Sequence, residues 1–282
     1  MTTPANPTTP ARPRPRAARK PGRRRVGAEW MPRQHGAWAM LFLPYLVGVT
    51  LLAQGGGVPA FAWPLLPAWL FGYFAFNALT LWLKSGRKPL YLRPALTYGA
   101  VSGVLGGLTL ALAPHLLGWA LAFAPLLGVG LWRAAHRDDA SLLARGSAVV
   151  AACLLTAVMT TGGPLDALRL PLTARPALAT LALWAYFLGT LLYVKTMIRE
   201  RGEAAYLTLS VGAHAVVFAL ALWGALTGVV PAAFPAFFLL TTVRAAVMPR
   251  LEGWRGRRVT PKQVGLTEFG ISFLLLFLLG WA

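Results

Sequence analysis

Long apolar runs, separated by short connections, recur along the chain after its first 30 residues. A hydrophobic stretch of about 18 or more residues is long enough to cross a bilayer as a helix. The sequence has nine such runs and therefore predicts an all-α polytopic membrane protein with about nine transmembrane helices. The composition, 57% apolar and only 12% charged, lies far outside the soluble range. The expected helices are residues 36–53, 61–83, 94–113, 115–132, 146–162, 177–195, 204–225, 227–248 and 264–281.

Prolines and glycines add detail to these helices. Pro114 separates the third helix from the fourth within one apolar stretch. Pro231 and Pro235 are expected inside the eighth helix, where neighbouring helices can satisfy the carbonyls that a proline frees. Glycines 99, 103 and 107 lie four apart on the third helix, and this GxxxG pattern lets another backbone approach closely. We expect that contact within the bundle, with dimerisation as the alternative.

Residues 1–30 differ from everything that follows. They are rich in Pro, Ala, Thr and Arg and offer little that can enter a hydrophobic core, which is typical of a disordered segment. The chain therefore divides into a disordered, basic, Pro-rich cytoplasmic tail at 1–30 and a transmembrane helical domain at 31–282. Arginines 23–25 can hold anionic lipid head groups. Such a cluster beside a membrane helix is more simply a topology signal than a nucleic-acid site, so no nucleic-acid partner is expected.

The distribution of Lys and Arg predicts how the helices are oriented. These residues gather in the tail and in the connections after the second, fourth, sixth and eighth helices. Of the 27, only Arg169 and Arg175 fall in the other connections. Because cytoplasmic loops carry the positive excess, we expect the N-terminus inside and the C-terminus outside, in the plasma membrane. The formal charge of +19 then reflects topology and requires no polyanionic partner besides the lipid bilayer.

Familiar catalytic and metal-binding motifs are absent from the sequence. It contains no HExxH, CxxC, P-loop, GxSxG or Rossmann fingerprint. Its single cysteine, Cys153, excludes an internal disulfide and a Cys-based zinc or redox site, and is expected to be a small packing residue. No metal site is therefore evident.

A polar stretch lies where the tail meets the first helix. Residues 31–40 read MPRQHGAWAM and place Arg33, Gln34 and His35 at the expected water–lipid boundary. This stretch resembles the opening signature of the YwiC-like family of bacterial membrane proteins. Residues 193–202 and 261–268 extend the resemblance toward the C-terminus. The family is largely uncharacterised, so the resemblance implies a topology and candidate polar positions, and no established reaction.

The expected arrangement also resembles the UbiA-type intramembrane prenyltransferases, which have nine helices, an inside N-terminus and functional loops after helices two and six. In that family, Asp-rich motifs in these loops hold magnesium diphosphate. Asn77 matches the asparagine of the first motif, and either Arg93-Pro94 or Arg87-Lys88-Pro89 resembles its following Arg-Pro. Lys195 and Arg199 stand in place of the aspartates of the second. Magnesium prefers oxygen ligands, so the resemblance implies a UbiA-like bundle without the usual magnesium site. The cofactor stays open.

Cations at the cytoplasmic ends of the helices are the main candidate binding residues. Lys195 and Arg199 share one helix face by their i, i+4 spacing, and such a face can bind phosphate or carboxylate. The alternative is a solvated positive loop in which Arg199 pairs with Glu203. The residues expected to bind an anionic head group are Arg33, Gln34, Asn77, Lys84, Arg87, Arg93, Lys195 and Arg199.

Three ionisable residues are expected inside the membrane: His214, Arg244 and Glu268. A charge in hydrocarbon costs roughly 2.5–3.5 kcal/mol on insertion scales, so it has a functional role unless it reaches the interface. Arg244 and Glu268 can pair or can both reach the interface. His214 is a candidate for proton transfer or ligand binding, with a hydrogen bond to a neighbouring helix as the alternative. His35 and His214 are the candidate catalytic residues.

Three functions remain open. In the first, a pocket at the cytoplasmic face binds a lipid or isoprenoid with an anionic head, and the cations replace the metal of a UbiA-like transferase. In the second, the protein is a carrier or permease for a small anionic solute. The odd number of helices and the lack of a visible inverted repeat count against it. In the third, it is a non-catalytic membrane assembly partner. We favour the first hypothesis, and whether the protein is an enzyme stays open.

Overall fold

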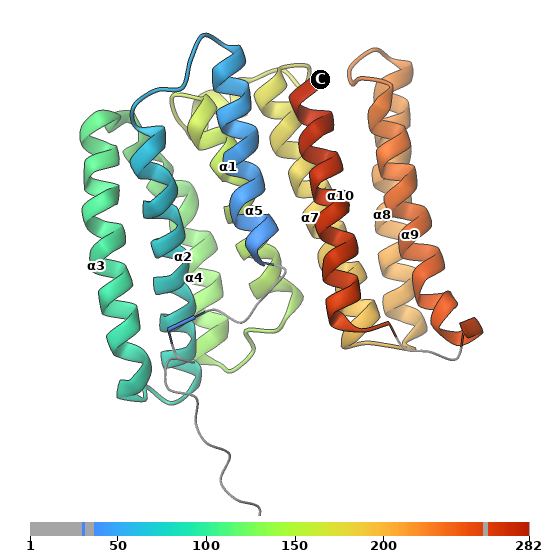
Figure 1. The fold of residues 1–282 in the computed structure, drawn as a ribbon, viewed down its shortest axis with the longest axis horizontal. Helices are drawn as coiled ribbons and strands as arrows, with labels where there is room; N and C mark the ends of the chain where they lie inside the picture. The colour runs from blue at the N-terminus through green and yellow to red at the C-terminus, as the bar shows by residue number, and fades with distance from the viewer. Residues whose placement is uncertain (1–29, 32–36, 256–258, 282) are drawn as a thin grey trace, which may run out of the picture.

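A computed structural model describes residues 30–31, 37–255 and 259–281 (Figure 1). The described chain is all-helical, and nine of its helices are long and apolar enough to cross a membrane, η1 and α4 counting as one. This confirms the predicted fold class. The tail at 1–29 and the candidates Arg33, Gln34 and His35 lie outside the described residues. The elements are α1 (Ala37–Gln54), α2 (Ala62–Lys84), α3 (Pro89–Leu112), the 3₁₀ helix η1 (Pro114–Trp119), α4 (Ala120–Ala135), α5 (Leu142–Thr160), α6 (Pro164–Arg169), α7 (Arg175–Ile198), α8 (Ala204–Leu226), α9 (Ala233–Arg255) and α10 (Pro261–Trp281).

Successive long helices run in opposite directions, so their connections alternate between two ends of the bundle (Figure 1). We call one end the cationic end. It carries the connections α2–α3, α4–α5, α7–α8 and α9–α10, together with the start of α1. The connections with few charges, including the short helix α6, lie at the opposite end. The loops that the charge pattern groups together therefore share one end, and the side of the membrane that each end faces stays a prediction.

Helix α5 lies at the centre of the packing and α3 at its edge. In the apolar part of α5, 61% of the residues are buried, against 6% in α3. Helix α5 packs on α1, α4 and α7, and the fully buried Cys153 is one of the small residues on it, as predicted. Thr156 of α5 donates a hydrogen bond to the carbonyl of Pro44 in α1 at 2.8 Å. The outer helices expose large apolar side chains, which suits contact with lipid.

Several helix boundaries differ from those expected. Helix α3 starts at residue 89 rather than 94, because Pro89 occupies the first helical position, where its missing N–H is not needed. The helix then continues through Pro94. The seventh and eighth expected helices are separated by a turn in which Gly228 has a φ of 73°. Pro231 therefore precedes α9, and Pro235 falls in its first turn, where proline is tolerated.

The predicted contact of the glycine stripe on α3 with another backbone within the bundle is wrong for the described chain, and dimerisation through the stripe stays a prediction. A Cβ atom added at Gly99, Gly103 or Gly107 would meet nothing within 4 Å. Helix α3 instead turns Ser102 toward α2, where its hydroxyl donates to the carbonyl of Ala68 at 2.8 Å. The small residue at that contact is Gly72, where a Cβ would lie 3.1 Å from Ser102 Oγ. The face of α3 that packs on α2 is therefore the one that carries the partly buried Ser102, not the one that carries these three glycines.

Candidate functional site

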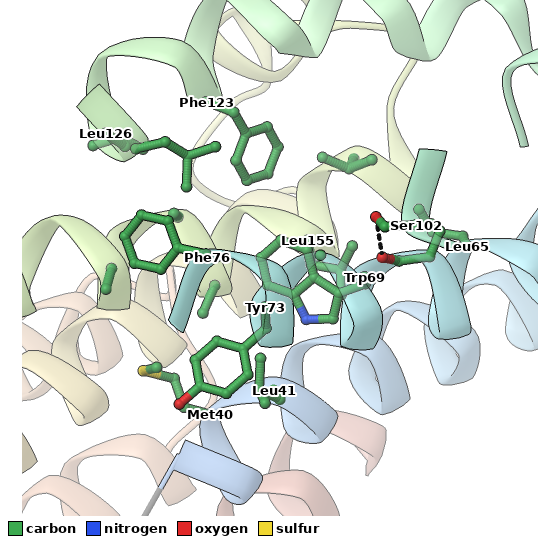
Figure 2. Close-up of a pocket in the computed structure, with 17 residues that line it drawn as sticks. Met40, Leu41, Leu65, Trp69, Tyr73, Phe76, Ser102, Phe123, Leu126 and Leu155 are labelled. Atoms are coloured by element: carbon green, nitrogen blue, oxygen red, sulfur yellow. Dashed lines mark hydrogen bonds between the residues drawn. The ribbon is translucent and has the colours of Figure 1, made fainter. Parts of the chain in front are cut away.

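A cavity of about 350 Å³ lies within the membrane-spanning region, bounded mainly by α1, α2, α4 and α5 (Figure 2). Its lining residues on α2 run from Leu65 to Phe76, which corresponds to about 16 Å at 1.5 Å per residue. The cavity therefore follows α2 over roughly half of that helix. Almost all of the side chains on its wall are apolar, with Ser102, Trp69 and Tyr73 as the exceptions.

Differences in side-chain size across the helix interfaces explain why space remains here. Helix α5 contributes Ala148, Ala151 and Ala152 to the wall. Large rings from α2 and α4 face the same space, and the rings of Trp69 and Phe123 lie 6.0 Å apart. A row of alanines cannot fill the volume that such rings leave between their helices, so the packing stays open at this position.

Charged residues from three connections meet at the cationic end. Lys84, at the end of α2, donates to both carboxylate oxygens of Asp139 at 3.1 and 3.0 Å. Arg145, in the first turn of α5, is close enough to be attracted by the carboxylate of Asp139 and repelled by the guanidinium of Arg199. The structure therefore brings together two predicted residues, Lys84 and Arg199, through two residues that were not in the predicted set. We call Lys84, Asp139, Arg145 and Arg199 the charged belt.

Lys195 belongs to a separate contact near the end of α7. Its ammonium group donates to the hydroxyl of Tyr206 at 3.0 Å, lies 4.5 Å from the centre of that ring, and is 3.5 Å from Glu200 Oε1. The pair of Arg199 with Glu203, considered above, is not among the ion pairs of the described residues. Glu200 thus neutralises Lys195, and Arg199 remains exposed.

The other predicted head-group residues lie on α2, on α3 and in the turn between them. Arg87 has a left-handed backbone, with a φ of 64°, and its guanidinium lies 5.7 Å from the ring centre of Trp82. Arg93 is exposed on α3, and Asn77 is half-buried on α2. None of these three lines the cavity. Among the described residues, no three His, Cys, Asp or Glu side chains lie together as a metal site would require.

The ionisable residues predicted inside the membrane form one buried ionic centre between α7, α8, α9 and α10. Arg244 Nη1 donates to Glu268 Oε1 and Oε2 at 2.5 and 2.6 Å. Arg244 is 6% exposed and Glu268 is 8% exposed, so the two pair inside the bundle and do not reach the interface. The guanidinium also lies 4.3 Å from the ring centre of Tyr193.

Hydroxyl groups complete the hydrogen bonding of the Glu268 carboxylate. Thr190 Oγ1 donates to Oε2 at 2.9 Å, and the hydroxyl of Tyr186 lies 3.3 Å from the same oxygen and 3.0 Å from Ser272 Oγ. Sequence reasoning missed these three residues because Thr, Tyr and Ser are common in apolar helices. The i, i+4 spacing of Tyr186 and Thr190 was the only available sign that they share a face.

His214 is held as a neutral ring in this centre. Its Nδ1 lies 2.7 Å from the backbone carbonyl of Ser210, which can only accept, so Nδ1 carries the proton. Its Nε2 is then an acceptor for Arg244 Nη2 at 3.3 Å. The ring packs on Gly189, where a Cβ would lie 3.0 Å from Nε2. His214 thus makes the alternative contact, a hydrogen bond to a neighbouring helix, and the centre as a whole ties four helices together. Its role in proton transfer or ligand binding stays a prediction.

Comparison with known proteins identifies relatives of unknown function. The model of the YwiC-like protein family matches residues 31–160. The uncharacterized protein YwiC of Bacillus subtilis is 31% identical over 200 residues, which cover 69% of this chain and 78% of that protein. An uncharacterized protein of Haemophilus influenzae is 28% identical over 254 residues, covering 87% of this chain and 95% of the relative. No solved structure matches. Every residue that lines the cavity lies within the segment matched by the family model.

Proposed function

The chain belongs to the YwiC-like protein family, and we propose that it binds a lipid or isoprenoid with an anionic head group in the plasma membrane of a bacterium. The observation that carries this proposal is the apolar cavity between α1, α2, α4 and α5. Ligand pockets typically enclose about 300–1,000 Å³ and are lined mainly by hydrophobic and aromatic side chains. The cavity matches this description in both size and lining.

The character of the wall selects the ligand class. An apolar chain enters such a space without the cost of stripping polar groups of their hydrogen-bond partners. A small anion would lose its hydration and find only three polar side chains in return. The cavity thus supports the binding of an apolar chain more strongly than it supports a path for an anionic solute.

The charged belt supplies the site for the head group. Arg145 lies three residues before Ala148, which lines the cavity, so the two side chains share a face of α5 and differ in height by about 4.5 Å. Arg145 is therefore about one turn beyond the cavity, in the direction of the cationic end. A head group there can pair with Arg145 and Arg199 through charge-assisted hydrogen bonds, without a metal ion.

Native mass spectrometry and lipid extraction of the detergent-purified protein test this proposal. We expect a lipid or isoprenoid to copurify with the wild-type protein and to be lost in Ala151→Leu and Ala148→Leu, which fill the cavity. Ala219→Leu, on an exposed position of α8, is the matched control and should retain it. A wild-type protein that carries no lipid, or equal retention in all of these variants, would contradict the proposal.

The head-group contact needs its own pair of variants. Arg145→Ala and Arg199→Ala should lower retention of the anionic ligand, because each removes a cation near the end of the cavity. Arg169→Ala, an exposed arginine of α6 at the opposite end, should leave it unchanged. Equal losses in all three variants would show that net charge matters and that the charged belt does not bind the head.

A further inference from the structure

Two hydrogen-bond donors on the cavity wall have no partner in the described part of the chain. They are the indole Nε1 of Trp69 and the hydroxyl of Tyr73, and both atoms are buried. The two residues lie four apart on α2, so they share one face of that helix, and both line the cavity (Figure 2). They are the two residues of the wall whose buried polar atoms lack a partner.

Their position makes this lack of partners costly. The interior of a membrane protein has no bulk water to satisfy an N–H or O–H group, so buried polar groups are normally paired. The third polar side chain of the wall follows that rule, because Ser102 donates to the carbonyl of Ala68. Wall residues such as Leu41, Leu155 and Phe123 have no acceptor, and the thioether sulfur of Met40 is only a weak one.

We propose that the ligand carries a carbonyl-type oxygen within its apolar body, and that this oxygen accepts hydrogen bonds from Trp69 and Tyr73. The indole N–H can only donate, so the missing partner must be an acceptor. This inference rests on the proposed function and narrows its ligand class. A plain prenyl or alkyl chain leaves both donors unpaired, whereas the ester carbonyl of an acyl lipid or the ring carbonyl of a quinone satisfies them.

Binding of matched probes to the full-length, delipidated protein in detergent tests the inference. Methyl myristate supplies an ester carbonyl and is compared with heptadecane; decylbenzoquinone supplies ring carbonyls and is compared with decylbenzene. We expect at least one carbonyl probe to bind about tenfold more tightly than its hydrocarbon, the difference that one net hydrogen bond makes. The arm that shows this preference identifies the ester or the ring carbonyl as the source of the acceptor.

Conservative variants then assign the preference to the two donors. Tyr73→Phe and Trp69→Phe should each reduce the carbonyl preference, the ratio of carbonyl-probe to hydrocarbon affinity within one variant, severalfold. Trp223→Phe, an exposed indole of α8, is the matched control and should keep the preference. Tyr73→Phe removes one oxygen atom and keeps the ring, so its fold is expected to be intact.

The outcomes separate this inference from the proposed function. If carbonyl and hydrocarbon probes bind the wild-type protein equally, or if Tyr73→Phe and Trp69→Phe both keep the preference, the acceptor inference is overturned while an apolar binding cavity still stands. If the wild-type protein binds none of the probes more tightly than Ala151→Leu does, the cavity takes up no apolar ligand. The proposed function and the inference then fail together.

Discussion

Removing one partner of the Arg244–Glu268 pair should destabilise the protein much more than removing both. Arg244→Met leaves the Glu268 carboxylate buried with only hydroxyl donors, from Thr190 and Tyr186. Breaking a buried ion pair in this way costs about 3–5 kcal/mol. In the double variant Arg244→Met/Glu268→Gln no charge remains, and the glutamine oxygen still accepts from Thr190. We therefore expect the double variant to recover most of the loss.

Reversible unfolding in mixed micelles, followed by tryptophan fluorescence, gives the four free energies of this double-mutant cycle. We expect an interaction energy of about 3 kcal/mol between the two positions, at the upper end of the range for residues in contact. Lys84 and Asp139 provide the control cycle, because their side chains are 43% and 27% exposed. Such a solvated pair contributes at most about 1 kcal/mol.

An interaction energy at Arg244 and Glu268 no larger than that of the control cycle would refute the buried pairing. The same variants also separate a structural role from a functional one. If the ionic centre only ties the helices together, the lipid bound per folded molecule should be unchanged in the double variant. Loss of lipid at unchanged stability would show instead that the centre takes part in binding.

Two further predictions concern packing and topology. Gly189→Ala should lower the thermal unfolding midpoint, because its Cβ would lie 3.0 Å from His214 Nε2. Gly99→Ala is the control and should leave the midpoint unchanged, because Gly99 faces open space. Equal effects of the two variants would contradict the packing of His214. A membrane-impermeant maleimide should label Lys88→Cys from the cytoplasmic side only and Arg169→Cys from the outer side only. The one native cysteine is buried and should not react. The reverse labelling pattern would invert the predicted orientation.

The charged residues inside the membrane show how far sequence reasoning reached. Arg244 and Glu268 stand out because a charge within an apolar run is rare, so their importance was evident from the sequence. From their positions in the sequence, the two side chains could equally pair with each other inside the bundle or each reach the water–lipid interface. The choice depends on how α9 and α10 are rotated about their axes, and that rotation follows from contacts with residues far away in the sequence, such as Tyr186 of α7.

The glycine stripe shows the opposite case. Gly99, Gly103 and Gly107 form a pattern that favours close helix packing, yet α3 meets α2 through the face that carries Ser102. Arg145 was likewise treated only as a topology signal. Its position one turn from the cavity depends on where α5 lies in the bundle, which no local pattern encodes.

The sequence by itself determined the class of protein, the number of spans, the alternation of the loops between two ends and most of the polar positions. Hydrophobic length and charge act locally, so each can be read from a short stretch of chain. Only the tertiary structure decided where the cavity lies, that Arg244 pairs with Glu268, and that Trp69 and Tyr73 line the cavity with buried donors that have no partner among the described residues. These features arise where side chains from several helices meet, and the size and rotation of every neighbouring helix contribute to them.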